Sequence, residues 1–106
     1  ENVKTNEVEL DDVGLRFVGL TSETRSRYNL PKNLKGVVIT AVKRDSFAAK
    51  AGLTVGSVIL QISQVNVKTA DEAKKIFDDA SKKGLESVLL QVFQNDFSRF
   101  LILKIK

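Results

Sequence analysis

The residues best suited to chemistry lie near the start of the chain, where Val13 and Leu15 flank Gly14. A glycine reaches the dihedral angles that turn successive backbone N–H groups toward one point, and such a nest binds an anion. A peptide carboxylate loses strong hydration when it docks, and convergent amides replace its water. We expect the donors to be the N–H groups of Gly14 and Leu15, with Val13 beside them. Taken alone the pattern is weak, and a β-bulge or a close-packed glycine is the simpler explanation.

The composition excludes most catalytic chemistry. The chain has no histidine and no cysteine, which rules out a histidine-based triad, histidine or thiolate metal sites and disulfides. Ser57 follows Gly56 but lacks the second glycine of a nucleophile elbow, and no phosphate-cradling loop motif is present. Lysines and carboxylates remain, but nothing in their arrangement indicates an enzyme. We therefore expect no catalytic residue, no metal and no cofactor.

Length and charge favour one domain with a well-solvated surface. The 106 residues, 42% of them hydrophobic, suffice for one core but not for two. The 17 basic and 13 acidic side chains are interleaved without a dense basic block, so we expect no nucleic-acid binding. No apolar run is long enough to cross a bilayer, and no signal-peptide pattern is visible. Because the chain begins at Glu1, we expect a mature or excised piece that has lost its targeting segment.

Hydrophobic patterning predicts an α+β domain. A run of β-branched residues after Gly36 indicates a buried strand, and alternation indicates others. The predicted strands are 13–20, 37–42, 58–62, 88–93 and 97–105, the last two forming a hairpin around Asn95 and Asp96. Val8 and Leu10 begin a further alternating segment, and residues 1–7 are expected to be a linker before a domain at 8–106. The order fits a small, partly open barrel or sandwich of five or six strands.

Capping signals predict two or three helices around these strands. Residues 22–28 follow an N-cap signal at Thr21, and Pro31 ends that segment. Residues 46–51 begin at the N-cap Ser46 and end before Gly52 in the left-handed conformation. The third helix begins at the capping box of Thr69 and Glu72 and ends at Gly84. Its apolar positions recur at helical spacing, at Ala73, Ile76, Phe77 and Ala80.

Three segments together resemble a PDZ domain of the bacterial HtrA/Deg type. The most specific runs are Gly36-Val37-Val38-Ile39-Thr40-Ala41-Val42, Ser46-Phe47-Ala48-Ala49-Lys50-Ala51-Gly52-Leu53 and Gly56-Ser57-Val58-Ile59-Leu60. The family usually shows GVxVxxV, SPAAxAGL and GDVIL at this spacing, so Phe47 and Ser57 depart from its usual proline and aspartate. Val13-Gly14-Leu15 is similar to the family's carboxylate-binding loop, and the capped helix and closing hairpin complete the match over residues 10–106. The helix signal after the first strand is similar to the C-terminal PDZ domain of a two-PDZ protease.

The resemblance implies a non-catalytic module that binds C-terminal or extended hydrophobic peptide segments. The ligand would add as an antiparallel strand along Leu15, Arg16 and Phe17, which is the family's mode of recognition. The opposite wall would be the capped helix, with Ala70, Lys74 and Phe77 toward the groove. Phe77 has the spacing of a core residue as well, and Lys74 either favours an acidic ligand residue or is simply solvated. Because Ala70 stands where many eukaryotic PDZ domains carry histidine, we expect apolar ligand ends without a Ser or Thr requirement.

The same resemblance implies a setting for the domain. Its partners would be peptide or unfolded-protein C-termini, the protease domain and the other PDZ domain of a periplasmic serine protease, with catalysis elsewhere and no membrane insertion. Two alternatives remain. The domain is a structural or oligomerisation module whose groove is unused or blocked by its own chain, or it belongs to a secretion-system or membrane-protease component. A peptide response separates the first alternative from the leading interpretation, and the neighbouring sequence separates the second.

Overall fold

A computed structural model describes residues 7–31, 33–94 and 96–105 of the chain. The elements, in chain order, are β1 (Val8–Leu10), β2 (Leu15–Gly19), α1 (Ser22–Arg27), β3 (Val37–Val42), α2 (Phe47–Ala51), β4 (Val58–Ile62), β5 (Val65–Asn66), α3 (Ala70–Lys82), β6 (Ser87–Gln94) and β7 (Phe97–Lys104). Residues 1–6 of the expected linker and Asn95 of the expected turn lie outside the described residues. The predicted α+β class is therefore confirmed, in the expected order of elements.

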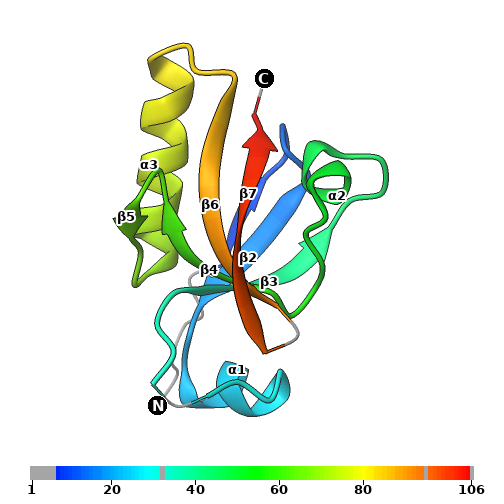
Figure 1. Ribbon diagram of the computed structural model, residues 1–106, viewed down its shortest axis with the longest axis vertical. Helices are drawn as coiled ribbons and strands as arrows, with labels where there is room; N and C mark the ends of the chain where they lie inside the picture. Colours follow the sequence, from blue (N-terminus) through cyan, green and yellow to red (C-terminus); the bar gives the residue numbers. More distant parts are fainter. Residues whose placement is uncertain (1–6, 32, 95, 106) are drawn as a thin grey trace.

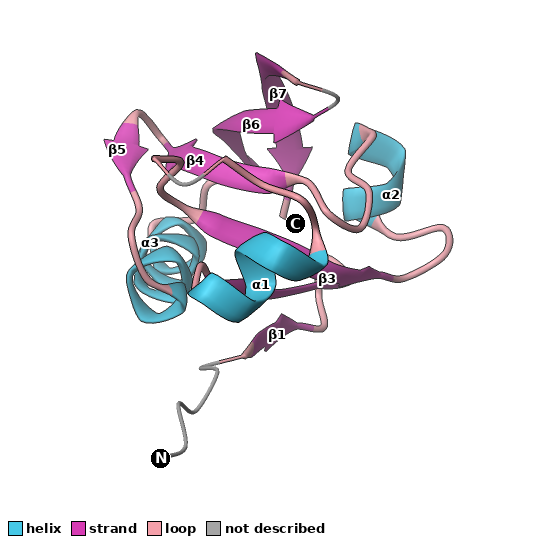
Figure 2. Ribbon diagram, turned by 90° about the horizontal axis from the view of Figure 1, so that it is seen from below, coloured by secondary structure: helices cyan, strands magenta, loops and turns pink. Residues whose placement is uncertain are grey.

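The strands form one antiparallel sheet that does not close into a barrel. Its order is β1-β2-β3-β4-β6-β7, and β5 pairs with β4 off this path. The described residues thus contain seven strands, where five or six were expected, because the two-residue β5 has no alternating pattern long enough to predict it. Figure 1 shows α3 along one side of the sheet, α1 at one end and α2 beside β7. Figure 2 shows the same three helices placed around the curved sheet.

Both faces of the central strands are buried, which explains their unbroken apolar sequence. In β3, Val37 and Ile39 point into the main core, and Val38 between them packs in a second cluster with Val18 and Val58. Successive side chains of a strand alternate between faces, so only a strand covered on both sides needs apolar residues at every position. The second cluster is covered by the segment that follows α1, with Tyr28, Leu30 and Leu34 packed against it.

The main core joins α3 to the sheet. The buried face of α3 consists of Ala70, Ala73, Phe77 and Ala80, and Ile76 packs partly against the same cluster. Small alanines let the helix approach the sheet closely, and Phe77 fills the space at its centre. The ring of Phe77 lies 6.2 Å from the ring of Phe17 in β2, measured between centroids. This contact fixes the position of α3 relative to β2, the two elements expected to bound the groove.

The N-caps predicted at Ser46 and Thr69 are present, but the capping box predicted for Thr69 and Glu72 is only half formed. The Ser46 side chain accepts a hydrogen bond from the N–H of Ala49 at 3.1 Å, and Gly52 ends α2 with φ of 94°. At α3 the Thr69 side chain accepts from the N–H of Glu72 at 3.1 Å. The Glu72 carboxylate, however, accepts from the N–H of Lys68 at 2.8 Å. The Ser46 and Thr69 hydroxyls each satisfy a backbone donor that the first helical turn leaves without a partner.

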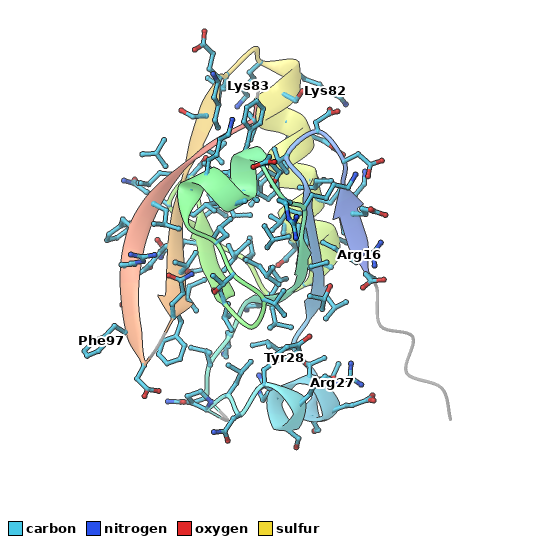
Figure 3. The ribbon with its side chains drawn as sticks, turned by 90° about the vertical axis from the view of Figure 1, so that its right-hand side faces the viewer. Arg16, Arg27, Tyr28, Lys82, Lys83 and Phe97 are labelled. Atoms are coloured by element: carbon cyan, nitrogen blue, oxygen red, sulfur yellow. The ribbon has the colours of Figure 1, made fainter. Side chains whose placement is uncertain are left out.

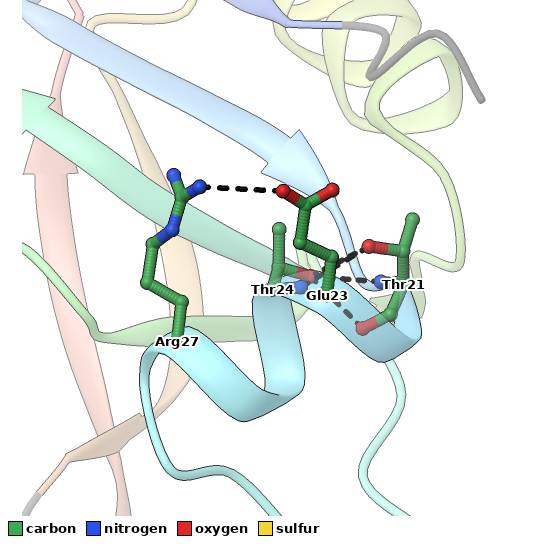
Figure 4. Close-up of polar contacts among 4 residues, drawn as sticks. All are labelled: Thr21, Glu23, Thr24 and Arg27. Carbon is green, nitrogen blue, oxygen red and sulfur yellow. Dashed lines mark hydrogen bonds and ion pairs between the residues drawn. The ribbon is translucent and has the colours of Figure 1, made fainter. Parts of the chain in front are cut away.

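The N-terminus of α1 is held by a reciprocal pair of threonines. Figure 4 shows the N–H of Thr21 donating to the Thr24 hydroxyl at 2.8 Å, and the N–H of Thr24 donating to the Thr21 hydroxyl at 3.2 Å. One turn later, Arg27 pairs with Glu23 at 3.4 Å on the exposed side. The six-residue helix depends on these local contacts because so short a helix is marginal by itself. None of the helices in the described part of the chain is long and apolar enough to cross a membrane.

Candidate functional site

The loop before β2 holds its glycine in a conformation that other residues rarely adopt. Gly14 has φ of +75° and is buried. A Cβ atom added there would overlap the Ser46 side chain, lying 2.7 Å from its Oγ, and would stand 3.1 Å from the Cβ of Lys43. The glycine is therefore required twice, for its backbone angles and for its close approach to the start of α2.

Hydrogen bonds fix the direction in which the loop amides point. The carbonyl of Val13 accepts from the N–H of Ala48 at 3.0 Å, and the carbonyl of Gly14 accepts from the N–H of Lys43 at 2.8 Å. The N–H groups of Val13 and Gly14 both donate to the carbonyl oxygen of Leu10, at 3.3 and 2.8 Å. Two successive amides thus converge on one oxygen, the arrangement of an anion nest.

The oxygen in this nest ends a short strand of the same chain. β1 pairs antiparallel with β2 on the edge opposite β3, with Val8, Glu9 and Leu10 opposite Phe17, Arg16 and Leu15. β1 also contacts α3, so it lies along both elements that were expected to bound the groove. The position where a ligand strand would add to β2 is therefore filled by residues 8–10.

The side chains of β1 alternate as those of an added strand would. Val8 is 7% exposed and belongs to the main core, and Leu10 packs partly against the same core. Glu9 points to the other face, where its Oε1 lies 3.3 Å from a terminal nitrogen of Arg16. Figure 3 shows Arg16 on the side of the molecule where β1 and β2 run next to each other. One face of β1 is thus apolar and bound, and the other is charged and partly open.

The predicted groove residues fall into two groups. Leu15, Phe17 and Phe77 are 1%, 0% and 4% exposed and form part of the main core. Ala70 is also buried, at the first position of α3, beside Gly19 at the end of β2. The structure therefore brings these four together in the main core, between β2 and α3.

The charged residues of the predicted set remain accessible. Arg16 is half-buried on β2, and Lys74 is exposed on α3, where its Nζ lies 2.9 Å from the carboxylate of Asp78. Neither is enclosed in the core, so both are accessible to a ligand side chain, although each is paired with a carboxylate. Their acidic partners differ in one respect, because Asp78 belongs to α3 itself and Glu9 belongs to β1.

A cavity of about 350 Å³ remains beside the loop, between the end of β1 and α3. Its apolar lining comes from Leu10, Val13, Phe77 and Ile105, and its charged rim includes Asp11, Asp12, Lys74 and Asp78. Phe77 is thus both a core residue and a cavity-lining residue. The two roles that the sequence left open for it are both present. A cavity of this size accepts one apolar side chain next to the amides of the loop.

Val8, Leu10 and Ile105 were absent from the predicted site. A signal for the first two existed, because Val8 and Leu10 alternate and Asp11 and Asp12 form the turn that follows them. Aspartates favour turns, and alternating residues before a turn indicate a hairpin. Ile105 is separated from the loop by the whole length of the domain, and no local signal places it there.

Comparison with known proteins identifies the family. The family model described as PDZ domain matches residues 38–91, more than half of the chain. The chain is a PDZ domain. The match begins in β3 and ends in β6, so it covers neither the loop at Val13-Gly14-Leu15 nor β1. PDZ domains are non-catalytic modules, as expected for a chain without a nucleophile motif.

Curated relatives of this PDZ domain are named as proteases. A protein of Brucella suis biovar 1 (strain 1330), named probable periplasmic serine endoprotease DegP-like, is 42% identical over 91 residues, covering 82% of this chain and 18% of that protein. A Chlamydia pneumoniae protein of the same name is 33% identical over 95 residues, covering 90% of this chain and 19% of that protein. The chain thus spans about a fifth of these relatives and matches their PDZ part.

Solved structures of HtrA proteins share the fold. The crystal structure of the HtrA3 PDZ domain bound to a phage-derived ligand (FGRWV) has a TM-score of 0.69 at 15% identity, covering 95% of this chain and 86% of that one. The HtrA-type protease AlgW with decapeptide has a TM-score of 0.67 at 23% identity, covering 87% of this chain and 27% of that one. Together with the family model and the DegP-like relatives, this shared fold confirms the expected resemblance to HtrA-type PDZ domains.

Proposed function

We propose that this PDZ domain binds the C-terminal or extended hydrophobic segment of a peptide as an antiparallel strand on β2, in the place that β1 holds. One observation carries this proposal. The N–H groups of Val13 and Gly14 converge on a carbonyl oxygen at the end of a strand that lies along β2 and α3. The loop, the strand edge and the helix are thus already arranged around a bound segment, and that segment is only three residues long.

In this proposal the backbone supplies affinity and the cavity supplies selectivity. Val13, Gly14 and Leu15 bind the carboxylate of the ligand, with charge-assisted hydrogen bonds that contribute about 1.5 to 3 kcal/mol each. Arg16 and Phe17 present the strand edge, and Ala70, Lys74 and Phe77 form the helix wall. The last ligand side chain enters the cavity next to Val13 and Phe77. Such a site fits a dissociation constant in about the micromolar range.

We place the domain in a periplasmic protease of the HtrA type, where it captures substrate termini or regulates the enzyme. The names of the curated relatives support this setting over a secretion system or a membrane protease. The AlgW structure was solved with a decapeptide and the HtrA3 PDZ domain with the phage-derived ligand FGRWV, which supports a peptide as the partner. The remaining partners in this proposal are the protease domain and the other PDZ domain of the parent protein, this chain being the C-terminal one.

A second candidate function is structural, with a groove that never opens. The pairing of β1 with β2 favours it, because the strand edge is already satisfied and Val8 is already buried. In that case the domain contributes assembly contacts and does not respond to peptides. The two candidates differ only in whether β1 leaves β2 at a small free-energy cost.

Titration with short peptides separates the two candidates. We expect peptides ending in Val, Leu, Ile or Phe to bind with dissociation constants of about 1 to 100 micromolar, measured by fluorescence anisotropy. The matched control is the same peptide with an amidated C-terminus, which cannot offer a carboxylate to the loop. We expect amidation to weaken binding about tenfold, the loss of one charge-assisted hydrogen bond. Equal binding of both forms would rule out the carboxylate nest, and no binding at all would favour the structural module.

A further inference from the structure

β1 resembles a bound ligand in three respects. It runs antiparallel to β2 and ends at the loop, so its direction is that of a chain whose C-terminus enters the nest. The carbonyl oxygen of Leu10 accepts hydrogen bonds from the N–H groups of both Val13 and Gly14. Val8 and Leu10, two residues apart, pack in or against the main core, and the side chain of Glu9 between them pairs with Arg16. The sequence of β1 therefore indicates which side chains this groove accepts, position by position.

The middle position of β1 is matched by charge. Arg16 lies opposite Glu9 in the register, with 3.3 Å between the terminal nitrogen and Oε1. Its Nε lies 4.0 Å from the carboxylate of Glu7, which also accepts a hydrogen bond from the Thr40 hydroxyl at 3.2 Å. Both acidic partners of Arg16 thus come from β1 or from the residue before it. When β1 leaves β2, the guanidinium loses both of them.

Unlike Arg16, Lys74 does not depend on β1 for its ion-pair partner. The partner of Lys74 is Asp78 on the same helix, at 2.9 Å, so this pair persists whether or not β1 is bound. Asp11 and Asp12 stand at the rim of the cavity next to the nest, and Asp11 pairs with Lys43 at 3.5 Å. These carboxylates disfavour an acidic last residue, while Arg16 favours an acidic residue one position earlier.

We infer that β1 is an internal stand-in for the ligand, and that the ligand which displaces it ends in an apolar, an acidic and an apolar residue, with the acidic side chain paired to Arg16. This inference rests on the proposed function and adds a selecting residue to it. The guanidinium of Arg16 presents a planar set of N–H donors. A carboxylate of the ligand can accept hydrogen bonds from them in place of Glu9. The pair is partly exposed, at 41% for the Arg16 side chain, so its contribution is modest and appears as a preference.

The test uses the full chain and two peptides with free carboxylates. The first has the sequence of residues 3–10, Val-Lys-Thr-Asn-Glu-Val-Glu-Leu, and the second has lysine in place of its second-last residue. We expect the wild type to prefer the acidic peptide by about threefold, a preference that Arg16→Lys keeps in part. We expect Arg16→Glu to reverse the preference. Arg27→Glu makes the same change of net charge on α1, beyond the end of β2 that lies opposite the loop (Figure 3), and should leave the preference intact.

The outcomes distinguish this inference from the proposed function. Equal binding of the two peptides by the wild type, or the same change of preference in Arg16→Glu and Arg27→Glu, would overturn the inference and leave peptide binding standing. No binding of either peptide, both to the wild type and to the Val8→Asp variant that weakens β1, would overturn the proposed function and the inference with it. Circular dichroism of each variant confirms that the compared proteins are folded.

Discussion

Replacing Gly14 by alanine should lower the free energy of unfolding by about 3 kcal/mol and remove peptide binding. Alanine at a φ of +75° costs about 1 to 2 kcal/mol in backbone strain. The added methyl group would also overlap the Ser46 side chain, whose Oγ would lie 2.7 Å away. Ser46 caps α2 and is held at 2.6 Å by the carbonyl of Lys43, so it does not move aside freely. Urea denaturation measures the loss, and anisotropy with an apolar-ended peptide measures binding.

Gly84 supplies the matched control. It has φ of +78°, close to that of Gly14, but a Cβ added to it meets nothing within 4 Å. Gly84→Ala therefore carries the backbone strain without the overlap, and we expect a loss of about 1 kcal/mol with normal peptide affinity. If the two variants lost the same stability, the close approach of the loop to α2 would be disproved.

Replacing Val8 by aspartate should raise peptide affinity about tenfold or more. Val8 is 7% exposed, and its burial contributes about 1.5 to 3 kcal/mol to holding β1 in place. A carboxylate at this position disfavours burial further, so β1 leaves β2 in most molecules. The apparent dissociation constant equals the intrinsic one divided by the fraction of molecules with an open groove. Since about 1.4 kcal/mol corresponds to a factor of ten, releasing β1 strengthens binding by that factor or more.

Val65→Asp is the control for the same change of side chain. Val65 in β5 is 52% exposed and takes no part in the main core, so its replacement should leave affinity unchanged. Thermal unfolding by circular dichroism should show a modest decrease for Val8→Asp, because β1 is a three-residue strand at the edge of the sheet. Unchanged or weaker binding by a folded Val8→Asp protein would mean that β1 does not compete with the ligand.

Elements with strong local signals could be predicted from the sequence nearly to the residue. β3 and β4 were predicted with the bounds that the structure has, since their β-branched runs are flanked by glycines and turn residues. The cap at Ser46 and the left-handed Gly52 followed from the same kind of local evidence. A cap or a buried strand is determined by residues a few positions apart, and such signals are visible without the fold.

Features that depend on distant residues could not be predicted. The alternation of Val8 and Leu10 indicated a strand, but the effect of that strand on the groove depends on α3, which lies sixty residues later in the chain. Ser57 stands where the family usually has aspartate, and it is buried with its hydroxyl bonded to Gln94 at 2.7 Å and to Thr54 at 2.9 Å. Gln94 on β6 lies thirty-seven residues from Ser57 in the sequence, and no local pattern predicts their contact.

The loop itself lies between these two cases. The flanking residues of Gly14 indicated a nest with the N–H groups of Gly14 and Leu15 as donors. In the structure the two converging amides are those of Val13 and Gly14, and the oxygen that they share belongs to Leu10. The sequence also left open whether the glycine is a close-packing residue, and its approach to Ser46 makes it one. Both properties coexist because the packing on α2 is what orients the amides.

The most direct test of the central claim locks β1 to β2. Glu9 and Arg16 lie directly opposite each other, at the spacing that a cross-strand disulfide needs, and the chain has no other cysteine to compete. A Glu9→Cys, Arg16→Cys variant should bind a peptide ending in Val-Gln-Leu when reduced and lose that binding when oxidised, with the folded state intact in both. Equal binding by the reduced and oxidised forms, or none by the reduced form, would contradict the claim that a ligand takes the place of β1.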